Sequence, residues 1–274
     1  MKADTIEVMG LFETDVRYLV PIYQRNYRWD EAEQWAPLWV DIRNVAEDVL
    51  ENGEEGNISD HFLGAIVCDQ MPVFGRDAKA VSVIDGQQRL TTLALVLAAL
   101  YGVCGDREFV DDQEYLKATV FNKHTVVRDR LDHRYKVWPN PADREAFVSA
   151  MQGGEGDSRP ERAIRFFKRE INGWLDLDRD LGPEDDDEET PQDRMTALTT
   201  AVLRFVKIVK IDLEENDNAQ VIFESLNGRG ERLTDADLIR NALFRQADSD
   251  GTDSMELYRL FGSAGAWVHQ FVNP

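Results

Sequence analysis

The chain has 274 residues, 43% of them hydrophobic, and a formal net charge of −21. Its length allows one large domain or two modest ones, and its hydrophobic content supports a sizeable core. The charge argues against a protein whose whole surface binds nucleic acid, because phosphates would be repelled everywhere, but it leaves room for a local basic groove.

Cysteine usage and hydropathy indicate a cytoplasmic protein without a membrane partner. Cys68 and Cys104 are the two cysteines, and their positions show no metal-binding spacing. A disulfide framework is therefore not expected. The first residues lack the apolar region of a signal peptide, and no apolar run reaches the roughly 18 residues of a membrane span.

The first elements surround a polar and aromatic segment. Residues 5–20 predict a short helix or an extended lead-in that ends in a strand at 18–20, which Pro21 closes. Asp30 and Glu33 then predict a helix start. An apolar stripe at helical spacing follows, and Pro37 marks its first turn or a kink. The stripe consists of Trp35, Leu38, Trp39, Ile42, Val45 and Val49.

Residues 21–30 hold an unusual local excess of aromatic and arginine side chains. The segment includes Tyr23, Gln24, Arg25, Tyr27, Arg28 and Trp29. Aromatic rings can stack on a nucleic-acid base, and arginines can neutralise phosphate. The alternative is a rim loop whose aromatic residues anchor it to the core.

The centre of the chain is a strand-to-helix junction with four polar residues. Residues 61–68 and 80–84 predict two antiparallel strands, and Gly64 within the first suits a close backbone approach. Leucines at helical spacing predict a helix over 86–101, which Gly102 and Gly105 end. The junction between strand and helix carries Asp85, Gln87, Gln88 and Arg89.

These residue types suit phosphate chemistry. A helix start favours anions, and Arg89 adds a planar fork for phosphate. Asp85 offers a hard oxygen ligand for magnesium, or a base, while Gln87 and Gln88 can hold a phosphate or a water. The alternative is a capping box, with Asp85 as the N-cap and Gln88 at the third helical position.

The second half is mostly helical over 107–175, with breaks at 138–141 and 152–156. Tyr135, Lys136 and the Trp138-Pro139 turn are candidates to approach the central site. Residues 176–193 form an acidic stretch, which predicts a solvated, disordered loop, with a DNA-mimicking segment as the alternative. A helix from about Arg194 and a strand over 205–213 follow.

The last part predicts helices over 217–226, from 233 onward and over 254–271. Between the first two, Asn227, Arg229 and Gly230 form a turn whose backbone N–H groups and guanidinium suit phosphate. A glycine C-cap gives the same pattern. Asp237 lies on one helix face with Arg240 and Asn241.

Four sequence blocks, in this order, resemble the N-terminal domain of GmrSD-type modification-dependent restriction enzymes, including the phosphorothioate-sensing, SspE-like ones. The blocks are Pro-Ile-Tyr-Gln-Arg-Asn-Tyr-Arg-Trp from residue 21, His-Phe-Leu-Gly from 61, Ile-Asp-Gly-Gln-Gln-Arg-Leu-Thr-Thr-Leu from 84 and Phe-Glu-Ser-Leu-Asn-Gly-Arg-Gly from 223. The resemblance covers about residues 10–100 and 200–245.

The resemblance implies an α+β fold: a small mixed sheet with helices, of the ParB/sulfiredoxin-like nucleotidase type, plus a mainly α-helical portion. The nucleotidase core would comprise 1–105 and 200–245, with a helical insertion at 106–199 and a helical linker at 246–274. The resemblance also implies an HNH-type nuclease domain that usually follows in the same chain. The four histidines here form no His-Asn-His arrangement, so DNA cleavage is not expected of these residues.

By the same resemblance, this domain hydrolyses an NTP, with GTP favoured, and requires Mg²⁺. Its catalytic residues would be Asp85, Gln87, Gln88 and Arg89, and its metal ligands Asp85 and Asp237. The nucleotide-binding residues would be Tyr23, Gln24, Arg25, Gly86, Thr91, Asn227, Arg229 and Gly230.

A second interpretation is a non-catalytic module that senses DNA, such as phosphorothioate DNA, within an antiphage defence system. Its contact residues would be Arg25, Tyr27, Arg28 and Trp29. Both interpretations make DNA a partner, and both leave room for a homo-oligomer.

Overall fold

A computed structural model describes residues 1–22, 24–72, 75, 77–127, 130–177, 189–214, 217 and 222. The helices predicted from 233 onward and over 254–271, and the turn at 227–230, lie outside these residues. Of the helix predicted over 217–226, only Asp217 and Ile222 are described.

Six strands form one mixed sheet, in the order β1-β6-β3-β4-β2-β5. The pairs β1–β6 and β3–β4 are antiparallel, whereas β3–β6, β2–β4 and β2–β5 are parallel. This confirms the predicted mixed sheet and the antiparallel pairing of the two central strands. The strands are β1 (Lys2–Glu7), β2 (Val16–Leu19), β3 (His61–Gln70), β4 (Lys79–Asp85), β5 (Val137–Trp138) and β6 (Val206–Asp212).

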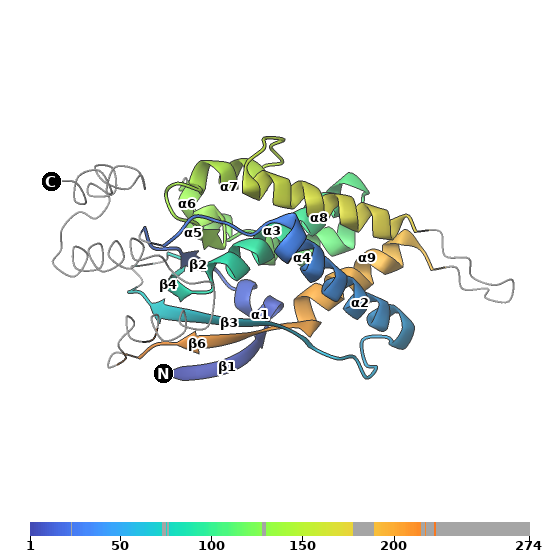
Figure 1. Ribbon diagram of the computed structural model, residues 1–274, viewed down its shortest axis with the longest axis horizontal. Helices are drawn as coiled ribbons and strands as arrows, with labels where there is room; N and C mark the ends of the chain where they lie inside the picture. The colour runs from blue at the N-terminus through green and yellow to red at the C-terminus, as the bar shows by residue number, and fades with distance from the viewer. Residues whose placement is uncertain are drawn as a thin grey trace, which may run out of the picture.

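Helices cover one face of this sheet, with α3 between the sheet and α8 (Figure 1). They are α1 (Val8–Phe12), α2 (Ala36–Asn52), α3 (Gln87–Asp106), α4 (Val110–Val120), α5 (His124–Val127), α6 (Leu131–Arg134), α7 (Arg144–Met151), α8 (Arg159–Leu175) and α9 (Pro191–Thr200). Two π-helical turns, η1 (Glu31–Trp35) and η2 (Ala201–Phe205), precede α2 and β6.

One hydrophobic core joins the sheet to the helices. It draws on β2, β3, β4 and β6 and on most of the helices, including α4, α7, α8 and α9 of the 106–199 segment. That segment also supplies β5 to the sheet edge. The opposite face of the sheet carries a smaller cluster of Val67, Ile84 and Leu213, against which Ile222 packs. The division into core, insertion and linker stays a prediction.

Helix α3 runs to Asp106, so the prediction that Gly102 and Gly105 end it was wrong. Val103 and Cys104 are fully buried, and this burial offsets the cost of two glycines in a helix. Within the described residues, α3 is also the one helix long and apolar enough to cross a membrane. The core surrounds it, however, and 72% of its apolar window is buried, as expected of a central helix in a folded domain.

The N-terminal lead-in is a short helix preceded by an edge strand. Residues 8–12 form α1, while residues 2–7 form the edge strand β1, which the sequence did not predict. The first four residues of β1 are exposed and polar residues dominate them, so no alternation of apolar side chains marks the strand. Pro37 lies in the first turn of α2, and Asp30 caps η1 by accepting a hydrogen bond from the Glu33 N–H.

Candidate functional site

The site is built around Gly86, which links β4 to α3. Gly86 has φ +87°, a left-handed conformation that favours glycine. A Cβ atom there would lie 2.6 Å from Ile66 Cγ2 and 2.9 Å from the Ala65 carbonyl oxygen. The turn therefore demands glycine twice, once for its backbone conformation and once because β3 passes directly beside it.

The capping box considered for this helix does not form. The N-cap of α3 is Gly86, and no side chain caps the helix. Gln88 instead reaches across to the preceding segment, where its Oε1 accepts a hydrogen bond of 2.7 Å from the Arg28 N–H. Its Nε2 donates to the Asn26 carbonyl oxygen at 3.0 Å. Gln88 thus fastens residues 26–28 onto the start of α3.

Two further glutamines, Gln24 and Gln87, are hydrogen-bonded to each other and are as buried as Gln88. Gln24 Nε2 donates to the Ile84 carbonyl oxygen at 2.8 Å, and Gln87 Nε2 donates to Gln24 Oε1 at 3.3 Å. Gln24 is 6% exposed and Gln87 is 7% exposed. Because buried amides need partners, these bonds fix the orientation of both side chains.

The two charged residues of the junction are half-buried, and their side chains differ in what they contact. Arg89 donates from Nη1 to the Ala65 carbonyl oxygen at 3.0 Å and packs over Gly64, whose absent Cβ would meet Arg89 Nε at 3.0 Å. This confirms the close approach predicted at Gly64. The Asp85 carboxylate has no hydrogen-bond or ion-pair partner among the described residues.

The aromatic and arginine segment is anchored through Tyr27. The Tyr27 ring is 4% exposed and stacks on Trp35 at a centroid distance of 6.5 Å. Its hydroxyl oxygen lies 2.7 Å from Thr92 Oγ1 and accepts a hydrogen bond of 2.9 Å from Trp35 Nε1. Burial raises the pKa of Tyr27. Arg28, by contrast, is exposed, and Trp29 is partly buried against the core.

Two residues near the Trp138-Pro139 turn, whose approach was predicted, contact the segment 24–27 although no motif in the sequence marks them. Asn140, which is 1% exposed, donates from Nδ2 to the Gln24 carbonyl oxygen at 2.9 Å and to Asn26 Oδ1 at 3.1 Å. Asp143 Oδ2 accepts a hydrogen bond of 2.7 Å from the Tyr27 N–H, while burial raises the Asp143 pKa. The two prolines, Pro139 and Pro141, signal a turn but not its partner.

The remaining predicted site residues are buried, already engaged in contacts or outside the described residues. Thr91 is 4% exposed within α3, and Arg25 is half-buried and engaged. Tyr23, Asn227, Arg229, Gly230 and Asp237 are outside the described residues.

Asp85 is the residue of the junction that could bind magnesium. Within the described part of the chain, no cluster of three or more His, Cys, Asp or Glu side chains could hold a metal ion. Mg²⁺ commonly uses one or two carboxylates together with substrate phosphates. Asp85, whose half-buried carboxylate has no partner among the described residues, fits that use as a single protein ligand.

A comparison with curated proteins gave no match. The family model of the GmrSD restriction endonuclease N-terminal domain matches residues 8–244. This match spans β2, the Tyr27 segment and the β4–α3 junction, so it contains the whole site described above. The chain therefore belongs to the GmrSD restriction endonuclease N-terminal domain family.

Proposed function

We propose that this domain hydrolyses an NTP, with GTP favoured, at the β4–α3 junction and so controls a nuclease domain of a restriction system. The observation that carries the proposal is the contrast within the junction. Two glutamines are locked by buried hydrogen bonds, and beside them the Asp85 carboxylate has no partner among the described residues. A fixed polar frame with one unpaired acid suits positioning and electrostatic work on a phosphate.

Each residue has a distinct role in this proposal. Gln88 is a positioning residue, because its amide holds residues 26–28 in place. Gln87 and Gln24 orient the water that attacks the terminal phosphorus, which releases inorganic phosphate and an NDP. Arg89 uses one of its five donors on Ala65 and offsets charge at the phosphate with those remaining. Mg²⁺ bound by Asp85 would neutralise the phosphate oxygens.

Phosphate release from GTP and from ATP tests the proposal. Asp85→Ala should abolish turnover because it removes the acid while leaving the buried network intact. Asp157→Ala is the matched control, since its side chain is 90% exposed at the start of α8, and it should retain full turnover. No phosphate release from the parent chain, measured in parallel with nucleotide binding and with an intact fold, would refute hydrolysis.

The DNA-sensing alternative has one observation in its favour. Arg28 is exposed, and its guanidinium has no partner among the described residues, whereas the neighbouring Tyr27 is buried. Arg28→Ala should then weaken stimulation by phosphorothioate DNA and leave basal turnover within about twofold of the parent. Arg165→Ala, an exposed arginine on α8, serves as the control. An equal loss of basal and stimulated turnover would mean that NTP hydrolysis and DNA sensing use the same site.

A further inference from the structure

A pocket lies between the end of α4 and the short helices α5 and α6, and none of its lining residues belongs to the junction. It has a volume of about 380 Å³, which falls within the range of small-molecule sites. Phe121, in its lining, packs edge-on against Tyr101 at a centroid distance of 5.3 Å. Tyr101 follows Gln87 by fourteen residues along α3, so its backbone lies about 20 Å along the helix from the junction.

Asn122, one of the residues that line this pocket, is held in place by four hydrogen bonds. Asn122, which is 5% exposed, donates from Nδ2 to the carbonyl oxygens of Val16 and His133, both at 2.9 Å. Its Oδ1 accepts a hydrogen bond of 3.1 Å from the Val16 N–H. The Asn122 N–H donates to the Arg134 carbonyl oxygen at 2.8 Å. The residues on either side of the pocket are thus tied to the sheet through β2.

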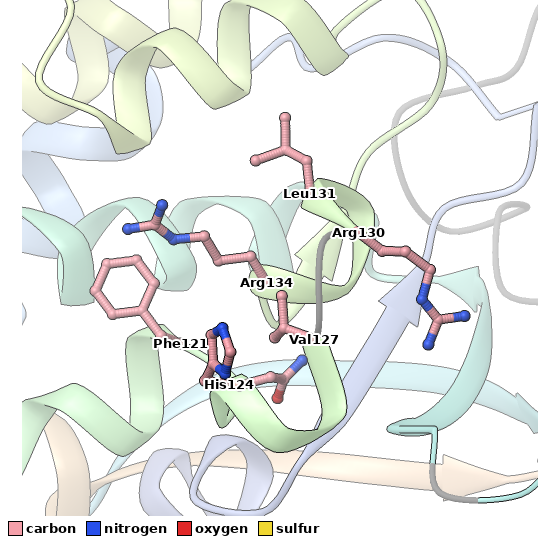
Figure 2. A pocket seen from close by; sticks show the side chains of 7 residues that line it. Phe121, His124, Val127, Arg130, Leu131 and Arg134 are labelled. Atoms are coloured by element: carbon pink, nitrogen blue, oxygen red, sulfur yellow. The ribbon is translucent and has the colours of Figure 1, made fainter.

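The cations around the pocket differ in their partners. Arg130 is neutralised by a two-pronged pair with Asp77, at 2.7 and 3.1 Å, and extends away from the other side chains (Figure 2). Arg134 has no carboxylate partner within the described ranges, and its guanidinium lies 5.0 Å from the Phe121 ring centroid. His124 is exposed beside them. Among the described arginines that line the pocket, Arg134 is therefore the one without a carboxylate partner, and its guanidinium also lies 5.7 Å from the Tyr135 ring centroid.

The rest of the lining is apolar. Val127 is 8% exposed and Leu131 is 45% exposed, and Figure 2 shows Phe121, His124 and Val127 grouped together with Arg134 extending toward Phe121. The surrounding sequence is basic within an acidic chain, because residues 121–136 contain five Lys or Arg and two Asp. An aromatic ring, apolar walls and an unpaired guanidinium suit a ligand that is planar at one end and anionic at the other.

We propose that this pocket binds a nucleotide: the Arg134 guanidinium leaves the Phe121 ring for the phosphate, beside His124, and the base takes its place against the ring. The ligand is either a free nucleotide or one nucleotide unit of DNA, since both present the same chemistry. The site is separate from the β4–α3 junction, so it would read or hold nucleic acid independently of NTP hydrolysis.

Binding of two probes to the chain tests this inference. A fluorescein-labelled single-stranded DNA of eight nucleotides is followed by fluorescence anisotropy, and deoxyguanosine 5′-monophosphate by calorimetry. Phe121→Leu removes the ring and keeps apolar bulk, while Arg134→Gln removes the charge. Each should weaken binding of the accepted probe about tenfold, since stacking on one base and one phosphate contact are each of that order.

The controls separate this site from general charge effects and from the junction. Arg162→Gln makes the same charge change at an exposed position on α8 and should change affinity less than twofold. Arg134→Gln should also lower the slope of log affinity against log salt by about one for the DNA probe. NTP turnover, measured on the same variants, should stay at the parent value, so failure here is distinct from failure of hydrolysis.

Loss with both probes supports a site for free nucleotides, and loss with DNA alone supports a site for a DNA unit. Unchanged binding in Arg134→Gln, which alters only an exposed side chain, would overturn the inference even if Phe121→Leu proved unstable. An equal loss in Arg162→Gln, or no binding of either probe by the parent chain, would overturn it as well.

Discussion

The β4–α3 junction and the pocket between α4, α5 and α6 hold their polar side chains in opposite ways. At the junction, neutral amides are buried and satisfied by one another and by backbone groups. At the pocket, an unpaired guanidinium stays exposed over an aromatic ring. Buried amides cannot adapt without losing hydrogen bonds, whereas an exposed arginine can. We therefore expect ligand binding to depend on fixed geometry at the junction and on charge at the pocket.

Gly86→Ala should have the largest effect on the junction, because it disturbs both the backbone turn and its contact with β3. A left-handed alanine costs about 1–2 kcal/mol, and the collision of its Cβ with Ile66 and the Ala65 carbonyl adds about 1–3 kcal/mol. We therefore expect the free energy of unfolding to fall by about 3 kcal/mol, together with loss of NTP turnover. Urea unfolding measures the first and phosphate release the second.

Gly153→Ala is the matched control for this change. Its φ of +83° is nearly that of Gly86, but nothing lies within 4 Å of the position of its Cβ. It should therefore cost only the strain of the left-handed backbone, about 1–2 kcal/mol. Equal losses in the two variants would show that the close passage of β3 contributes nothing.

A smaller effect is expected from Asn140→Ala, which removes the link between the Pro139–Pro141 turn and the Gln24 segment. It leaves the Gln24 carbonyl oxygen without this donor, at a cost of about 2 kcal/mol in unfolding free energy. If Asn140 positions Gln24, kcat should fall more than KM rises. Asn52→Ala, at an exposed helix end, should change stability by less than about 0.5 kcal/mol. A normal kcat in a destabilised Asn140→Ala protein would reduce this residue to a structural role.

The sequence predicted the central elements because their signals are local. The β-branched run of β4, Gly86 and the leucine repeat of α3 each follow from neighbouring residues, as does the antiparallel partner β3. The edge strand β1 was missed because its polar residues gain order only from pairing with β6, more than 200 positions away. Local patterns do not encode such pairing.

The sequence singled out polar residues at the junction but not their partners, and the roles of Gln87 and Gln88 in the site stay predictions. A capping box was an equally good use for Gln88, because its actual partner lies sixty residues earlier at Arg28. Asn140 and Asp143 carry no chemical motif, and their contacts with residues 24–27 cross more than 110 positions. For Tyr27 the sequence allowed either stacking on a base or anchoring to the core, and the buried ring shows that it is an anchor.

The smallest effect concerns the cation buried next to the pocket residues. Lys136 is 2% exposed and donates to the Thr14 carbonyl oxygen at 2.8 Å, and its burial lowers its pKa from 10.5 to about 8. Below pH 8 both the folded and the unfolded chain hold this proton, so the folded state bears the full cost of the buried charge. Between pH 8 and 10.5 only the unfolded chain holds it, so the contribution of Lys136 to stability improves as pH rises.

Lys136→Met should therefore stabilise the fold by about 1 kcal/mol at pH 7, because the charge-burial cost it removes exceeds the lost hydrogen bond to Thr14. The advantage over the parent chain should shrink between pH 8 and 10.5, as measured by urea unfolding at each pH. Lys123→Met, an exposed neighbour, should show no such trend. A gain that stayed constant up to pH 10.5 would mean that Lys136 keeps its ordinary pKa in the folded chain, and that the pocket region tolerates a buried charge as readily as an exposed one.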